Sequence, residues 1–153
     1  MESGALIELH AHILPQMDDG SESVEMSLAM LQALAEMGVG TVCATSHYYA
    51  RENSITMYLA RRAAALNALH SAIPAGSSLP HILPAAEAAY FRGMEEHHPE
   101  RLCIENTRTL MLEMPFSEWT DQQVETVAVL SLDLHFNVVL VHPERFCSCL
   151  LYT

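Results

Sequence analysis

Short apolar blocks alternate with longer, periodically apolar segments along the chain. The short blocks predict five strands, at residues 5–7, 41–45, 82–86, 110–112 and 138–141. The first looks like a buried strand. The last is apolar throughout, as expected for a strand covered on both faces. Pro84 weakens the prediction of central pairing for the third strand, because proline donates no ladder hydrogen bond.

The longer segments between these strands carry apolar residues at helical spacing. Capping residues mark where the helices begin: Ser21 or Ser23 for the first, Asn53 for the second and Thr120 for the third. Gly38 is a suitable stop for the first helix. Gln123 completes a capping box with Thr120. Residues 90–106 have a mixed pattern that predicts a short helix and a connection.

Strands that alternate with helices predict parallel βα units. Two arrangements stay open on this pattern, a doubly wound sheet and part of a (β/α) barrel. A chain of 153 residues corresponds to one domain, and no repeat, low-complexity tract or linker indicates a second one. The fold class predicted from the pattern is therefore α/β.

Composition narrows the classes of partner and compartment. Nineteen acidic against seven basic residues give a formal charge of −12, which argues against a nucleic-acid partner. No run approaches the ~18 apolar residues of a membrane span, and the first residues lack a signal-peptide pattern. We therefore expect a cytoplasmic protein without a membrane span. None of the four cysteines is followed six residues later by arginine, so the loop of thiol-dependent phosphatases is absent, and Cys43 is expected to be a buried free thiol.

Every predicted strand leads into a histidine or a carboxylate. These residues are His10 and His12, His47, Glu87, Glu113 and His142. Since chemistry in parallel α/β folds lies at the carboxyl ends of the strands, all six are expected at one rim. A solvated or hydrogen-bonded side chain is the simple alternative at any one position. The five strands together favour a cluster of divalent ions such as manganese, iron or zinc.

Four further residues are considered as substrate contacts. Arg145 lies three residues beyond the last candidate ligand and has the shape to bind a phosphate, with a surface salt bridge as the alternative. Asp18 belongs either to a carboxylate pair near the metals or to an ordinary acidic turn. Tyr48 and Tyr49 either line a substrate cleft or pack in the core. We assign Arg145 a catalytic and substrate-binding role, and Asp18 and Tyr48 a substrate-binding role.

The order of these motifs resembles the PHP (polymerase and histidinol phosphatase) superfamily. The matching segments are residues 8–15, 18–20, 44–47, 86–87, 112–115 and 141–145. The combination of His-Ile-Leu-Pro, Asp-Asp-Gly and His-Pro-Glu-Arg is typical of one branch of that superfamily. This branch comprises the bacterial protein tyrosine phosphatases of capsular and exopolysaccharide loci.

The resemblance implies a distorted TIM-like (β/α)₇ barrel that holds divalent ions, commonly manganese. It implies that the six strand-end residues are metal ligands and that Arg145 holds the substrate phosphate. It further implies removal of phosphate from a phosphorylated bacterial tyrosine kinase that regulates polysaccharide synthesis. Two other functions stay open: another PHP phosphoesterase acting on a small phosphorylated metabolite, and a non-catalytic remnant that persists as an oligomer or binds a kinase.

The chain departs from the family pattern in several places. Glu8 stands where the family usually has aspartate, and Ser46 and Tyr48 replace residues of a Thr-Pro-His-His motif. The family continues past the His-Pro-Glu-Arg segment to a late Asp-x-His pair that completes its metal site, and no Asp-x-His follows residues 142–145 in this chain. We therefore expect a C-terminally truncated, partial barrel of about five βα units. Its phosphatase domain is predicted at 1–146, with a tail of unknown role at 147–153.

Overall fold

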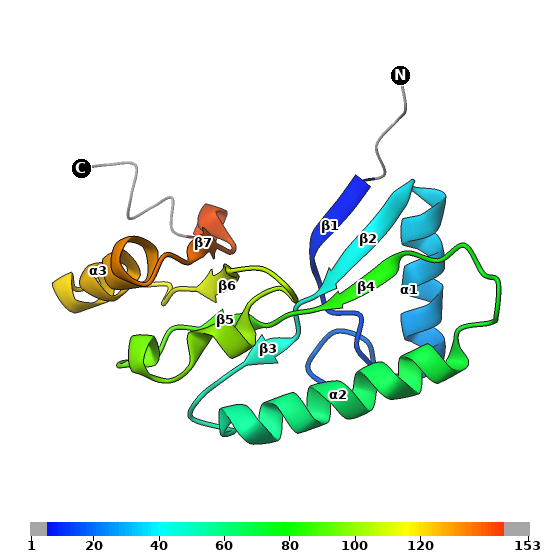
Figure 1. Cartoon of the computed structure of the whole chain (residues 1–153), viewed down its shortest axis with the longest axis horizontal. Helices are drawn as coiled ribbons and strands as arrows, with labels where there is room; N and C mark the ends of the chain where they lie inside the picture. Colours follow the sequence, from blue (N-terminus) through cyan, green and yellow to red (C-terminus); the bar gives the residue numbers. More distant parts are fainter. Residues whose placement is uncertain (1–5, 146–153) are drawn as a thin grey trace.

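The computed structural model describes residues 6–145, so the tail predicted at 147–153 lies outside the described residues. The helices and strands are β1 (Leu6–Ala11), α1 (Val24–Glu36), β2 (Val39–Ala44), β3 (His47–Tyr48), α2 (Ile55–Ala72), β4 (His81–Pro84), β5 (Glu87–Ala89), β6 (Thr109–Glu113), α3 (Asp121–Ala128) and β7 (Asn137–Leu140). The strands form two parallel sheets, ordered β1-β2-β4 and β3-β5-β6-β7. In Figure 1 helices α1 and α2 lie beside the first sheet, whereas α3 lies beside the second. The chain is therefore an α/β protein with parallel sheets, as predicted.

The chain passes from the first sheet to the second through two adjacent steps. One step lies between β2 and β3, and the other between β4 and β5. Ala44 pairs with Pro84 before the steps, and His47 pairs with Glu87 after them. The strand predicted at 82–86 is confirmed as β4 over 82–84 but extends two residues too far, because the chain leaves the first sheet after Pro84.

Side chains of helix α2 hydrogen-bond to the backbone at both steps. The Tyr58 side chain is 2% exposed, and its hydroxyl donates to the Ser46 carbonyl at 2.8 Å and to the Ala85 carbonyl at 3.4 Å. The Arg62 guanidinium donates to the same Ala85 carbonyl at 2.9 Å. Both points where the chain changes sheet are thus held by a single turn of α2.

Replacing Tyr58 with phenylalanine is expected to destabilise the protein by about 1 kcal/mol, because it removes a buried hydroxyl donor and keeps the ring. The two carbonyls retain other donors, Glu87 N–H and Arg62, which limits the loss. Urea unfolding followed by circular dichroism measures the change. An unchanged unfolding midpoint would show that the hydroxyl does not stabilise the steps.

Capping residues set the helix ends close to the predicted positions. Of the two serines predicted to cap α1, Ser23 is the cap and accepts from the Met26 N–H, and the capping box that opens α3 is confirmed. Gly38 follows α1 with φ +84°, a conformation that suits glycine at a helix stop. The predicted cap Asn53 is wrong by one residue, because the Ser54 side chain caps α2 instead. The short helix predicted within 90–106 is two 3₁₀ turns, Met94–Glu96 and Pro99–Leu102.

Burial differs from the prediction at the outer strands. Leu6 and Ile7 are 59% and 61% exposed, so the expectation that the first strand is buried is wrong. The reason is that β1 pairs only with β2 and forms a sheet edge within the described chain. Strand β7 forms the corresponding edge of the other sheet and is only half-buried.

Two of the cysteines, Cys43 and Cys103, are buried free thiols, as predicted for Cys43. Within residues 6–145, no helix is long and apolar enough to cross a membrane.

Candidate metal centre

Four imidazoles surround the carboxylate of Glu87, the first residue of β5. Its Oε2 lies 2.8 Å from His10 Nε2, 3.0 Å from His12 Nε2 and 3.5 Å from His47 Nδ1. Its Oε1 lies 3.1 Å from His142 Nε2. The Glu87 side chain is fully buried, whereas the imidazoles are partly exposed. The strand ends thus converge on one buried anion, as the sequence pattern predicts.

The fold explains why these side chains meet. His10 and His12 are separated by one residue, so both rings leave β1 and its end on the same side. His47 and Glu87 are directly paired at the start of β3 and β5. His142 follows β7 with φ +52°, a left-handed conformation that is uncommon for histidine and recurs at functional sites.

The residues around Glu87 fit divalent cations. Glu87 Oε1 and His47 Nδ1 are buried atoms that make no hydrogen bond of acceptable geometry. His142 Nε2 lies 3.1 Å from the first atom, and Glu87 Oε2 lies 3.5 Å from the second. Such groups are costly unless something pairs with them. Two groups bring their ligand atoms within 4.8 Å of one another, one with His10 and His142 and one with His12 and His47, and Glu87 belongs to both. Nitrogen donors with a shared carboxylate suit manganese, iron or zinc.

Asp18 contacts the ring nitrogen of His12 that faces away from Glu87. Its Oδ2 accepts from His12 Nδ1 at 2.9 Å and from the His47 backbone N–H at 2.8 Å, and its Oδ1 accepts from the Gly20 N–H at 3.0 Å. A carboxylate on the far nitrogen of a ligating histidine orients the ring and raises its basicity. We predicted substrate binding for Asp18. In the structure Asp18 is almost fully buried and contacts His12, so we infer an orienting role, and substrate binding stays a prediction.

The two carboxylates change the protonation of His12 in the metal-free protein. Burial opposes the charged ring, but hydrogen bonds to Asp18 and Glu87 outweigh burial and raise the pKa of His12 to about 10. Burial likewise disfavours the charged form of Glu87, yet hydrogen bonds from His10 and His12 hold the pKa of Glu87 well below its ordinary value. At neutral pH the metal-free centre therefore holds a proton on His12 beside two carboxylates.

Loading the metal-free protein at pH 7.5 is expected to release about one proton from His12 per chain, because a ligating imidazole must be neutral. The release should disappear as the pH rises through 10, where His12 has already lost the proton. A weakly buffered titration with an indicator dye measures it. Asp18→Asn removes one of the raising interactions and should reduce the release near neutral pH. Full metal binding without proton release at pH 7.5 would contradict this account.

Asp19 is a candidate ligand that the sequence left without an assigned role, although a carboxylate pair near the metals was one interpretation of its loop. Its Oδ1 lies 3.7 Å from His47 Nε2, and it forms a third potential metal group with His12 and Asp18. The side chain is 86% exposed, so it is free to move toward an ion. The Asp-Asp-Gly loop was the available signal, but spacing alone does not show which of two adjacent acids faces the histidines.

Glu113 and Arg145 lie at the edge of the cluster. Glu113 Oε2 is 4.0 Å from His47 Nδ1, and its Oε1 is 3.9 Å from an Arg145 guanidinium nitrogen. The guanidinium also lies 5.1 Å from the centre of the Phe116 ring. The carboxylate that Arg145 approaches is thus a candidate ligand, and the guanidinium itself is half-exposed.

Tyr48 and Tyr49 point in opposite directions from β3 and its end. Tyr48 is 4% exposed and packs against Tyr58 and Phe91, so the structure places it in the core and not at a substrate cleft. Tyr49 stacks on His47 with 5.1 Å between ring centres. Alternation along a strand puts residues 47 and 49 on the same face, and this signal favours Tyr49 over Tyr48.

The comparisons with known proteins agree with this centre. The family described as "Capsular polysaccharide synthesis, CpsB/CapC" matches residues 6–151. The chain belongs to the CpsB/CapC family. As a CpsB/CapC protein it is 28% identical, over 142 residues, to the tyrosine-protein phosphatase YwqE of Bacillus subtilis strain 168. That alignment covers 92% of this chain and 55% of YwqE.

A solved structure gives a further comparison for this CpsB/CapC chain. It comes from work on YwqE of Bacillus subtilis and CpsB of Streptococcus pneumoniae, described as unique metal-dependent tyrosine phosphatases. The TM-score is 0.75 at 26% identity, over 92% of this chain and 56% of that one. The chain therefore spans about half the length of the relatives it matches.

Proposed function

We propose that this chain acts as a metal-dependent protein tyrosine phosphatase. Its proposed substrate is phosphotyrosine on a bacterial tyrosine kinase that regulates capsular or exopolysaccharide synthesis. The observation that carries the proposal is the buried Glu87 carboxylate surrounded by four imidazoles, with Arg145 near Glu113 at the edge of the cluster. Membership of the CpsB/CapC family and similarity to YwqE support the substrate class.

The residues of the centre take separate roles in this hydrolysis. His10, His12, His47, His142, Glu87 and Glu113 are the proposed metal ligands. Bound divalent ions would polarise the phosphoryl group, and they would lower the pKa of a coordinated water so that a nucleophile is available at neutral pH. Asp18 holds His12 in the ligating orientation through Nδ1. Arg145 binds the phosphate and offsets the charge that develops on it.

The finer features are part of the same proposal. We propose manganese as the resident ion, and the nitrogen and carboxylate donors also accommodate iron or zinc. The parallel strands and the likeness to the solved structure support a portion of a distorted (β/α)₇ barrel of the PHP type, with the phosphatase domain at 1–146. A phosphorylated tyrosine kinase is the proposed partner.

Release of phosphate from a phosphotyrosine peptide tests the proposal. The protein loaded with manganese should hydrolyse the peptide, and a chelator should abolish the reaction. Arg145→Lys should lower kcat/KM about tenfold, since lysine keeps the charge but loses the bidentate geometry. No phosphate release with manganese, iron or zinc would overturn the proposed activity for this chain.

A further inference from the structure

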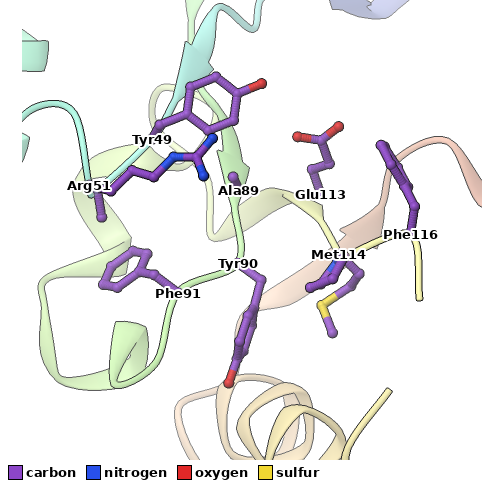
Figure 2. Close-up of a pocket in the computed structure, with 10 residues that line it drawn as sticks. Tyr49, Arg51, Ala89, Tyr90, Phe91, Glu113, Met114 and Phe116 are labelled. Carbon is purple, nitrogen blue, oxygen red and sulfur yellow. The ribbon is translucent and has the colours of Figure 1, made fainter. Parts of the chain in front are cut away.

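An aromatic cavity of about 230 Å³ opens beside Glu113. Four rings line it, those of Tyr49, Tyr90, Phe91 and Phe116 (Figure 2). Ligand sites for drug-sized molecules usually exceed roughly 300 Å³, so this cavity has the size for a single side chain. Its lining is mostly apolar and aromatic, with Arg51 and Glu113 as its charged members, so an aromatic occupant fits it best.

Two of its walls are in direct contact with the metal centre. Tyr49 stacks on His47, and Phe116 lies under the Arg145 guanidinium. In Figure 2 the Glu113 carboxylate projects between Tyr49 and Phe116. A group bound at Arg145 would therefore meet the cavity at its Glu113 side, where Tyr49 and Phe116 stand.

We propose that this cavity receives the aromatic ring of an aryl phosphate ester, with Tyr49 and Phe116 as the residues that select aryl over alkyl esters. The proposal rests on the proposed function only in placing the phosphate at Arg145. Rings prefer offset or edge-to-face contacts, which walls on two sides provide. The short side chain of phosphoserine would leave these walls exposed to water while its phosphate occupied the same position.

Equilibrium binding of two phosphonates measures this selection without catalysis. Phenylphosphonate and methylphosphonate present the same anion to the manganese-loaded protein, and only the first carries a ring. We expect phenylphosphonate to bind about 2- to 10-fold more tightly by calorimetry or ligand-observed NMR. Phe116→Leu and Tyr49→Leu should abolish that ratio, whereas Phe116→Tyr and Tyr49→Phe, which keep the ring, should preserve it.

The outcomes separate this proposal from the proposed function. A variant that merely disturbs the fold or the ligands would weaken the binding of both phosphonates equally, and that result would overturn the cavity proposal. Equal affinities of the two phosphonates for the unchanged protein would overturn it as well. If neither phosphonate binds, p-cresol, the tyrosine side chain without phosphate, is tested directly by saturation-transfer NMR. A p-cresol signal lost in Phe116→Leu but kept in Phe116→Tyr would support the cavity and count against the metal-dependent phosphatase. No signal would overturn the cavity as well.

Discussion

Glu87→Gln is expected to weaken metal binding about 100-fold or more, since even residues outside the ligand set contribute 10- to 100-fold. Glu87 is the member shared by the two ligand groups that include His10 and His47, and it is their only carboxylate. The amide keeps the shape but removes the charge, and its NH₂ donors face imidazoles. Catalysis, if it depends on the ions, should be lost with them. Metal content after gel filtration, measured by mass spectrometry, is the direct readout.

Glu36→Gln on the exposed end of α1 provides a matched control for Glu87→Gln. It makes the same chemical change next to the start of β2, the opposite end of that strand from the one that leads to His47, and should retain the metal content of the unchanged protein. Equal metal content in the two variants would show that Glu87 is not a ligand. The proposed ligand set would then have to consist of the histidines and the other acids of the cluster.

Gly20→Ala is expected to destabilise the protein by about 1–3 kcal/mol through overpacking and to displace His12. A Cβ at position 20 would overlap both the Cβ and the carbonyl oxygen of His12. That carbonyl accepts the Ser21 N–H, so the loop and the end of β1 cannot separate without losing this bond. Chemical unfolding gives the stability change, and metal titration reports the displaced ligand.

Gly76→Ala separates crowding from backbone strain. Gly76 has φ +77° and open space around its Cβ position, so alanine there should cost about 1 kcal/mol through its left-handed conformation alone. Metal affinity should stay unchanged. If Gly20→Ala and Gly76→Ala behaved alike in both measurements, the close approach of Gly20 to His12 would have no role in the centre.

Local signals in the sequence predicted most of the elements. A capping box depends only on neighbouring residues, and Thr120 with Gln123 opens α3 as expected. Apolar runs located the strands for the same reason. The burial of β1 could not be read this way, because exposure depends on which elements pair with it far along the chain. The change of sheet after Pro84 likewise involves contacts from a distant element, since Arg62 of α2 donates to the Ala85 carbonyl from 23 residues away in sequence.

In the candidate site, too, some features follow from local sequence signals and others depend on the fold. Strand ends predicted which imidazoles and carboxylates share the rim, because parallel strands bring their carboxyl ends together. The roles of Asp18 and Asp19 could not be separated, since both are acids in one loop and only the fold turns Asp18 toward His12. Tyr48 was predicted in place of Tyr49 although alternation from His47 along the strand favours Tyr49.

The buried thiols determine how oxidation by peroxide would affect the proposed phosphatase. Peroxide attacks thiolates that are exposed, and it silences phosphatases whose nucleophile is cysteine. Burial raises the pKa of Cys43, and it raises the pKa of Cys103 to about 11, so both stay protonated and shielded. Neither belongs to the ligand groups found among residues 6–145. Peroxide control of this centre would therefore not act through these two thiols.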